Sequence, residues 1–593
     1  MAAIAVLAVA FAVFAAIPAV ADDSDAAQVT PVTTEDELTK AVETASFNVK
    51  ISNDIALTKQ LVINKSGTID FDGKTISTSV TDANVIKIQS TSGTIDVVLK
   101  NGIVDASKLG GKSGAQAVSI GMYKGNDLTS IENVTLTDLT IKSGCYGVGV
   151  FGETSLKGVD SDKTTVVVKI TGGSIEAVAE STISTNGMHG GEKITIQGVN
   201  LKSTNNAAIY APSNGQWSVN GCTIEGVSGI DQRAGTVTVS GKTTIQYNGP
   251  AEAVTGGDGP VAFGVGVSVM PNSSYSGVGT TMTIGDSVTF VKGTENANEQ
   301  IFVTPFEYKT ASYDAVKTAK GTVPADTLVT YKGFKVQYTE GDNNATATVI
   351  GFGNKSTDLT VGAQATVAVS QDLTGKLTNK GIVQVAAGKT LDASATGACT
   401  DAGITYLAKG AILKVPADTN VTSVKVGADA KIFVDGKAIT PTEGQKKSEV
   451  NNESDFIEAI EGGVETVNVV SAVTVNKDIV VPAGTTLNTT GSNAITLANG
   501  KTMTVDGAFT GTIIGSGATD GQVNLKDFKG AFAVKAGSVT ISGASLVEGT
   551  IEVVSGPVVI TGVINADITI VDKTATASPA GTATVTFKDA TIG

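Results

Sequence analysis

Residues 168–175 read VKITGGSI, and residues 194–201 read ITIQGVNL. In both stretches positions 1 and 3 are apolar, position 5 is Gly, and position 8 is aliphatic. Alternating apolar and polar residues are typical of a strand with one buried face. A glycine at position 5 tolerates the left-handed backbone of a tight turn, and the aliphatic residue at position 8 returns the chain to the core. Each stretch therefore predicts a strand, a bend and a second strand.

This octet recurs along the chain, with Gly, Asn or Asp at position 5. Its other full copies begin at residues 69, 97, 134, 217, 432, 539 and 585. Three related copies, which carry Thr at position 8, begin at residues 237, 282 and 503. Strand-and-turn units that repeat at steps of about twenty or more residues, with little helix, indicate a stacked β-solenoid. An array of Ig-like sandwiches, the rival fold, would show paired hairpins at more regular spacing.

Two short amphipathic helices are also predicted, each directly before closely spaced strands. The first begins at Thr34, which forms a capping box with Glu37. The second begins at Ser454, which can cap its helix. It cannot form a capping box, because Ile457 stands three residues later where the box needs Glu or Gln. A helix at the mouth of a β-solenoid covers the exposed strand edge and the open end of the core. The sequence therefore predicts two solenoid modules, each with its own cap.

At this point the chain resembles a known group of proteins. The E-L-x-x-A-V opening at residues 37–42, the strand-rich run after it and the G-x-x-I coils are similar to the pectin-lyase-like superfamily. They most resemble the secreted adhesin-like surface proteins of bacteria and archaea, over roughly residues 34–290 and 450–593. The resemblance implies an all-β fold, a right-handed parallel β-helix in two modules that each open with a short capping helix.

Local changes in amino-acid composition suggest how the chain divides into domains. Aromatic residues cluster within 291–350, which predicts a small inserted β unit or a large loop packed on the solenoid. Residues 440–452 are polar, as in a linker. We expect a signal peptide at 1–21, a first β-helix module at 22–290, the inserted unit or loop at 291–350, further β-rich coils at 351–439, the linker at 440–452 and a second β-helix module at 453–593.

The N-terminal segment predicts where the protein acts. Residues 2–21 are uncharged and almost wholly apolar, and Ala19 and Ala21 fit a signal-peptidase site. The rival interpretation is an uncleaved membrane anchor, since a segment of this length can just span a bilayer. The three cysteines form no CxxC pattern and are expected to be buried small apolar residues. We therefore expect an extracellular or cell-surface protein, which contacts a membrane only if this segment is uncleaved.

Composition and motifs argue against several classes of function. A net charge of −15 with a single Arg argues against nucleic-acid binding, and one His cannot build a multi-His zinc site. The resemblance implies cleavage of acidic polysaccharides by the enzymes of the superfamily, with Ca²⁺ carboxylates in lyases and Gly-His-Gly and Arg-Ile-Lys elements in hydrolases. His189 lies in MHGG and Arg233 in QRAG, so the hydrolase elements are absent. We expect no enzyme and no cofactor, and Ca²⁺ is not indicated.

One group of residues suggests a ligand site. Tyr210 follows the octet at residue 194, and Asp231 and Arg233 follow the octet at residue 217 at a similar offset. Such positions fall on adjacent rungs, about 5 Å apart, and Asp231 and Arg233 alternate to the same side of a strand. His189 lies in the turn before residue 194. Together they would bind a sugar, with Tyr210 as the stacking face. The plainer interpretation is a surface ion pair beside an exposed Tyr.

The expected function is adhesion or envelope structure. An exported rod would present a long face and loops to extracellular glycans or to a host or neighbouring cell surface. The first alternative is a polysaccharide lyase or glycoside hydrolase of the pectin-lyase-like superfamily, which would need carboxylates from neighbouring rungs to meet Lys or Arg in a cleft. The second alternative is a self-assembling S-layer-type subunit.

Overall fold

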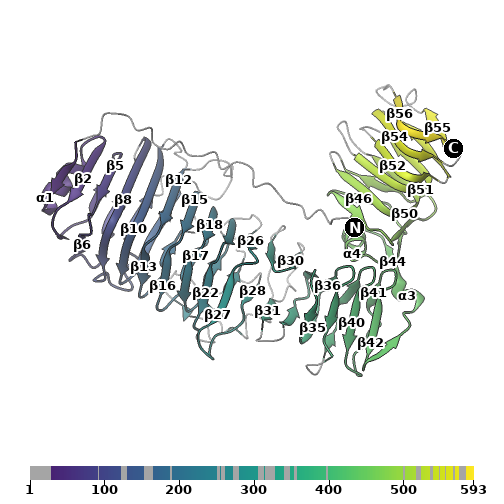
Figure 1. The fold of residues 1–593 in the computed structure, drawn as a ribbon, viewed down its shortest axis with the longest axis horizontal. Helices are drawn as coiled ribbons and strands as arrows, with labels where there is room; N and C mark the ends of the chain where they lie inside the picture. The colour runs from purple at the N-terminus through teal and green to yellow at the C-terminus, as the bar shows by residue number, and fades with distance from the viewer. Residues whose placement is uncertain are drawn as a thin grey trace.

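The protein is built almost entirely from parallel strands that stack into long sheets (Figure 1). The computed structural model describes residues 28–90, 92–121, 130–152, 165–186, 190–249, 254–255, 261–270, 280–304, 313, 327–338, 347–352, 357–394, 399–498, 501–515, 522–534, 539–546, 548–553, 556–564, 568–572 and 583–592. Side chains are described only up to residue 513.

The longest sheet, here sheet A, has 23 strands. Its strands are β1 (Thr30–Val32), β2 (Phe47–Ile51), β3 (Ile55–Leu57), β5 (Gly67–Asp70), β6 (Thr75–Thr78), β8 (Gly93–Ala106), β10 (Ser130–Ser143), β12 (Val166–Thr171), β13 (Ser174–Ala177), β15 (Gly190–Gln197), β16 (Asn200–Ser203), β18 (Asn214–Asn220), β19 (Thr223–Gly226), β21 (Thr236–Ser240), β22 (Thr244–Tyr247), β26 (Thr281–Ile284), β27 (Thr289–Lys292), β29 (Leu328–Tyr331), β30 (Phe334–Tyr338), β33 (Ala365–Val369), β36 (Ile382–Val385), β39 (Ile404–Leu407) and β41 (Val424–Val426).

Sheet B has 13 strands and takes one short strand from each turn of the chain. Its strands are β4 (Leu61–Ile63), β7 (Ile86–Ile88), β9 (Gln116–Gly121), β11 (Tyr146–Phe151), β14 (Ile183–Ser184), β17 (Ile209–Ala211), β20 (Ile230–Gln232), β25 (Val267–Val269), β28 (Ile301–Val303), β31 (Thr348–Phe352), β32 (Thr357–Val361), β35 (Leu377–Asn379) and β38 (Thr400–Asp401). An antiparallel pair, β23 (Val254–Thr255) and β24 (Val261–Ala262), lies outside both sheets.

Two further sheets complete the described strands. Sheet E comprises β34 (Leu373–Thr374), β37 (Thr390–Asp392), β40 (Ile412–Val415), β42 (Lys431–Val434) and β43 (Lys437–Ile439). Sheet F, drawn in light green to yellow in Figure 1, comprises β44 (Lys447–Val450), β45 (Thr466–Val469), β46 (Val473–Val475), β47 (Ile479–Val481), β48 (Thr486–Thr489), β49 (Ile495–Leu497), β50 (Thr502–Gly515), β51 (Gln522–Val534), β52 (Val539–Leu546), β53 (Glu548–Val553), β54 (Gly556–Ile564), β55 (Ile568–Asp572) and β56 (Ala583–Ile592).

The octet organises sheet A as the sequence predicts. In the copies that begin at residues 97 to 282, the first positions pair rung by rung into one apolar ladder, which Val329 of β29 continues, and each member is at most 3% exposed. That ladder is Val97, Val134, Val168, Ile194, Trp217, Val237, Met282 and Val329. At position 5 the backbone is left-handed, with φ of 61° at Asn101, 49° at Asp138 and 63° at Gly198. The parallel, stacked β-solenoid is therefore confirmed, because the bend recurs at the same place in successive rungs.

The copy at residue 432 is an exception. Its first strand, β42, stacks parallel on β40 as predicted, but its second strand does not continue the coil. Strands β42 and β43 pair antiparallel, Ile432 opposite Ile439. Asp435 and Gly436 both have positive φ, 51° and 71°. Two adjacent residues with positive φ form the tight loop that favours a hairpin. The copies at residues 539 and 585 form β52 and β56, and their side chains lie outside the described ones.

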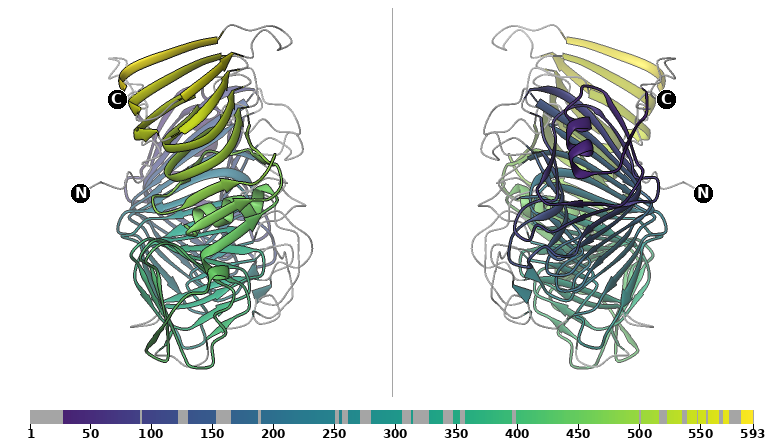
Figure 2. Two further views of the ribbon diagram at one scale, coloured as in Figure 1. Left: turned by 90° about the vertical axis from the view of Figure 1, so that its right-hand side faces the viewer. Right: turned by 90° about the vertical axis from the view of Figure 1, so that its left-hand side faces the viewer.

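Helix α1 (Glu35–Val42) lies across the end of the first rungs (Figure 2, right). It buries Leu38 and Val42 against them. The Thr34 hydroxyl accepts a hydrogen bond from the Glu37 backbone N–H at 3.3 Å, so the predicted cap is confirmed. The Glu37 carboxylate accepts from the backbone N–H and the hydroxyl of Thr33, at 2.7 and 2.9 Å, which replaces the return bond of a full capping box.

Helix α4 (Glu453–Glu461) is also present, but its predicted cap is wrong. The N-cap is Asn452, whose side-chain oxygen accepts from the Asp455 backbone N–H at 2.9 Å. Ser454 lies inside the first turn and donates to Glu458 at 3.1 Å. The helix buries Phe456, Ala459 and Ile460 in a second apolar core that also contains Tyr406.

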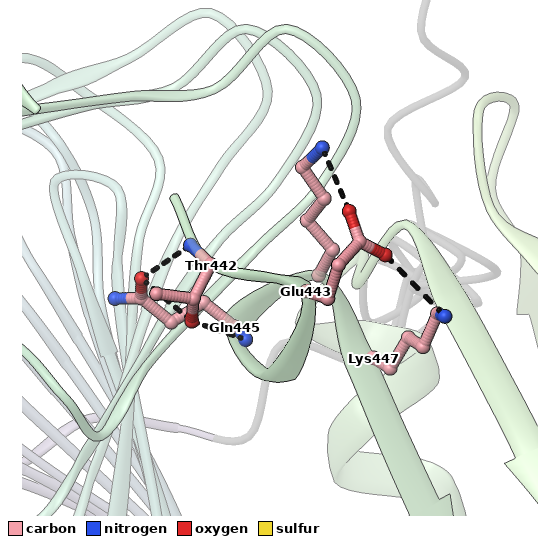
Figure 3. Close-up of polar contacts among 5 residues, drawn as sticks. Thr442, Glu443, Gln445 and Lys447 are labelled. Carbon is pink, nitrogen blue, oxygen red and sulfur yellow. Dashed lines mark hydrogen bonds and ion pairs between the residues drawn. The ribbon is translucent and has the colours of Figure 1, made fainter. Parts of the chain in front are cut away.

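Residues 440–452, predicted as a linker, contain regular structure. Helix α3 (Glu443–Lys446) begins with a full capping box between Thr442 and Gln445 (Figure 3). Glu443 pairs with Lys446 at 3.5 Å and with Lys447 at 3.4 Å. The Gln445 side chain also donates to the Val421 carbonyl at 2.8 Å, so this segment is bonded to the coils before it.

Residues 291–350 continue the two main sheets. Strand β28 pairs parallel to β25, and β29 pairs parallel to β26. Antiparallel strands β30 and β31 follow, and β33 and β32 then restore the original direction. Tyr331, Phe334 and Tyr338 are at most 4% exposed and belong to the main core. The predicted aromatic segment is thus, in its described residues, an antiparallel interruption within the solenoid.

Candidate functional site

The outer face of sheet B carries the residues that the sequence predicts as a site. In β17, Ile209 belongs to the main core, and Tyr210 points to the opposite face of the strand. In β20 the same alternation places Asp231 outward, and Tyr210 pairs with Asp231 in register. Ser268 of β25 follows next to Asp231 on the same ladder. The predicted placement on adjacent rungs is therefore confirmed.

Arg233 joins these residues into a compact polar group. Its Nη2 lies 3.5 Å from Asp231 Oδ2, and its guanidinium carbon lies 5.1 Å from the centre of the Tyr210 ring. Ser268 Oγ donates to Asp231 Oδ1 at 3.2 Å. A guanidinium over an aromatic face and beside a carboxylate is attracted to both. The group thus holds the Tyr210 ring in a fixed orientation.

The exposure of this group differs from the prediction. Tyr210 is 6%, Asp231 0% and Arg233 1% exposed, so Tyr210 is not an open stacking face and the ion pair is not on the surface. Further along the same ladder, Phe302 pairs with Ser268 and packs against Phe263 and Tyr313, with ring centres 5.5 and 5.0 Å away. Alternation sets the direction of a side chain, whereas burial here depends on what covers the sheet. His189 lies outside the described residues.

A more accessible group lies beside it and was missed by the sequence prediction. Tyr146, at the start of β11, and Glu180, before β14, are both half-buried. The Asn206 amide donates to Glu180 Oε2 at 2.9 Å, and the Tyr146 hydroxyl hydrogen-bonds the same carboxyl group. Strand β14 pairs with β17, which carries Tyr210, so this group lies beside the buried one. Here we call Tyr146, Glu180 and Asn206 the rim group.

The electrostatics of the rim group follow from its partial burial. Loss of solvation raises the pKa of Glu180 to about 7, although hydrogen bonds from Asn206 and Tyr146 oppose the rise. The pKa of the Tyr146 hydroxyl is also raised, by burial first and then by the neighbouring Glu180 carboxylate. Glu180 can therefore accept or donate a proton near neutral pH, and Tyr146 stays a neutral hydrogen-bond donor.

A signal for the rim group does exist in the sequence. Tyr146, Glu180 and Asn206 each lie five residues after the last position of an octet, in three successive copies. The same offset on consecutive rungs predicts neighbouring side chains. A search for residues at a constant offset from the octet would have found them without a structure.

Other buried carboxylates have a structural role. Glu192 replaces an apolar residue on the inner face of β15, where it accepts from the Gly152 N–H at 2.9 Å and from the Ser213 hydroxyl at 3.1 Å. Glu132, on the inner face of β10, accepts from the Ser90 N–H at 2.7 Å. Each links the end of a sheet B strand to sheet A, because it satisfies a backbone donor where the chain leaves sheet B.

The cysteines and the metal-ligating side chains of the described ranges were the subject of further sequence predictions. Cys145 and Cys222 are buried as expected, Cys399 is half-buried, and none of the three is in a disulfide. Within the described ranges, no cluster of three or more His, Cys, Asp or Glu side chains could hold a metal ion. No helix in those ranges is long and apolar enough to cross a membrane.

Comparison with protein-family models and with curated proteins gave no match. The pectin-lyase-like and adhesin-like character of the chain therefore remains a resemblance in repeat style. The part of the resemblance that the structure supports is the stack of parallel strands.

Proposed function

We propose that this chain is an exported cell-surface protein, adhesin-like or structural in the envelope, that presents its β-solenoid as a rigid rod and binds glycans at the rim group. The observation that carries the proposal is the row of Tyr146, Glu180 and Asn206 on three consecutive rungs, in which Tyr146 and Glu180 are half-buried and the buried Asn206 donates to Glu180. An aromatic ring, a carboxyl group and an amide are side chains that bind the apolar faces and the hydroxyls of sugars.

The buried group supports the rim group. Arg233 lies over the ring of Tyr210, and β17, which carries Tyr210, pairs with β14 of the rung that carries Glu180. A binding site is most precise when its contact residues are oriented by packed, hydrogen-bonded neighbours on strands. In this proposal Tyr210, Asp231 and Arg233 therefore position the ligand-contacting residues and do not touch the ligand.

We also infer the finer features of the fold. Connections between parallel strands of one sheet are right-handed in about 98% of cases, which favours a right-handed coil. The separate sheet F, with α4 on its own core, supports a second module after the first. Extracellular or cell-surface location rests on the N-terminal segment of the sequence.

The alternative function is a polysaccharide lyase or glycoside hydrolase. One feature favours it, namely the half-buried Glu180 carboxyl group beside the hydroxyl of Tyr146, where burial raises the pKa of Glu180 to about 7. A carboxyl group with a raised pKa suits a general acid. A hydrolase would also need a second accessible carboxylate, and Asp231 is fully buried beside Arg233.

A glycan array, probed with residues 22–593 with and without Ca²⁺, tests the proposal. In parallel, absorbance of unsaturated uronate product is followed on pectate and alginate. We expect binding without product, and we expect Glu180→Gln or Tyr146→Ala to weaken binding at least tenfold. Glu449→Gln, an exposed strand carboxylate on sheet F, serves as the matched control and should bind like wild type. Product formation would favour the enzyme, and no binding would reject the glycan site.

A further inference from the structure

The outer face of sheet A carries a row of charges whose sign alternates from rung to rung. In register, β8, β10, β13, β16 and β19 contribute one charged residue each. The row is Asp105, Lys142, Glu176, Lys202 and Glu225. The residue before each of them is buried, so these five side chains point away from the core. Here we call the five residues the charge ladder.

The charge ladder is accessible on the surface of the rod. Lys142, Glu176 and Lys202 are exposed. Lys202 Nζ lies 3.2 Å from Glu225 Oε1, with the two side chains 54% and 29% exposed. The parallel row two residues earlier is uncharged. It comprises Ile103, Thr140, Ser174, Asn200 and Thr223, so small polar side chains flank four of the five ladder residues.

Pairing within one chain accounts for only part of this pattern. Ion pairs between exposed side chains contribute little to stability, so the ladder adds little as an internal support. An alternating row is, however, complementary to a copy of itself. If a two-fold axis passes between the rungs of Lys142 and Glu176, Lys142 faces the partner's Glu176, and Asp105 faces the partner's Lys202. If the axis passes through a rung, every charge faces one of its own sign.

We propose that the charge ladder is a two-fold interface between two copies of this chain. A closed dimer uses the same patch on both subunits, and such a patch must be self-complementary under the two-fold operation, as this one is. The alternation also selects the alignment, since a shift by one rung brings like charges together. This inference is independent of the glycan site, because the ladder lies on sheet A and the rim group lies at sheet B.

The interface should depend strongly on salt. Exposed charges are screened within about 30 Å at 0.01 M salt and within about 3 Å at 1 M. We therefore expect sedimentation of residues 22–593 to show a dimer at low salt that dissociates to monomer at high salt. The net charge of −15 opposes association, so the pattern of charges has to overcome a general repulsion.

Charge-reversal variants distinguish the effect of the charge pattern on dimerisation from the effect of the net charge. Lys142→Glu with Lys202→Glu makes the ladder wholly acidic, and Glu176→Lys with Glu225→Lys makes it mostly basic. The second variant lowers the net charge from −15 to −11, since two Glu become two Lys, yet we expect both variants to be monomers. Mixing the two should restore a one-to-one dimer, because opposite ladders then meet.

The control is Lys169→Glu with Lys193→Glu, which makes the same charge change at exposed positions of sheet A outside the ladder. It should dimerise like wild type. Circular dichroism confirms that each variant is folded. A wild-type chain that stays monomeric at low salt, or reversal variants that still form homodimers, would overturn the proposal.

Discussion

Glu192 is a carboxyl group enclosed by the solenoid, at 2% exposure. Desolvation raises its pKa from 4.5 to about 7, despite hydrogen bonds from Gly152 and Ser213. The folded pKa thus lies above the unfolded one, so the folded chain binds more protons between these values. The stability that this group contributes is complete below about pH 4.5 and is lost as the pH rises through about 7.

Glu192→Gln should remove this pH dependence. The glutamine keeps the shape, and its oxygen can still accept from Gly152. The free energy of unfolding of wild type minus that of the variant should fall by about 3 kcal/mol as the pH rises from about 4.5 to about 7, at about 1.4 kcal/mol per pKa unit, and should be level above that range. Urea unfolding across this pH range measures the difference. A difference for Glu192→Gln that does not change with pH would refute the assignment.

At the scale of elements, the start of α4 gives a clear test of the helix cap. Asn452 has the extended backbone of an N-cap and accepts from the Asp455 N–H. Asn452→Ala should therefore destabilise the protein by about 1 kcal/mol, the usual effect of losing a cap. Ser454→Ala, inside the helix, should change stability by less than half of that. Thermal unfolding compares the two, and a larger loss for Ser454→Ala would contradict the structure.

These elements also show what the sequence could predict. Local patterns located helices α1 and α4 and the repeated bend but missed α3, because a cap, a left-handed residue and apolar alternation act over a few residues. Ser and Asn are comparable N-caps, so the sequence could not choose between Asn452 and Ser454. Similarly, Asp435–Gly436 fits both the octet and a hairpin, and the pairing of β42 with β43 decides between them.

At the scale of the whole molecule, non-local packing decides what local patterns cannot. Tyr210, Asp231 and Arg233 were correctly placed on adjacent rungs, but their burial depends on residues distant in sequence. Phe263 and Tyr313 cover the same face of sheet B further along. The residues of the 291–350 segment were likewise predicted as an insertion because aromatic residues cluster there. Tyr331 and Tyr338 instead fill the core, and each hydroxyl reaches a backbone carbonyl, of Val288 and Val303.

The rim group and the charge ladder both depend on rungs that stack in register. The sequence gives the least reason to expect such stacking at the antiparallel interruption within residues 291–350. Thr283 of β26 pairs with Thr330 of β29 across this boundary. Neighbouring strands lie about 4.8 Å apart, within the Cα separation of a disulfide. Lys335 pairs with Thr330 on the next strand, about twice as far from Thr283.

The most direct measurement is therefore disulfide cross-linking of paired cysteines, in a chain whose three native cysteines are replaced by alanine. Thr283→Cys with Thr330→Cys should oxidise to an internal disulfide in nearly all molecules, seen by mass spectrometry of the cleaved chain. Thr283→Cys with Lys335→Cys should remain reduced. A reduced Thr283–Thr330 pair, or a disulfide in the second variant, would contradict a solenoid whose rungs continue in register through this region.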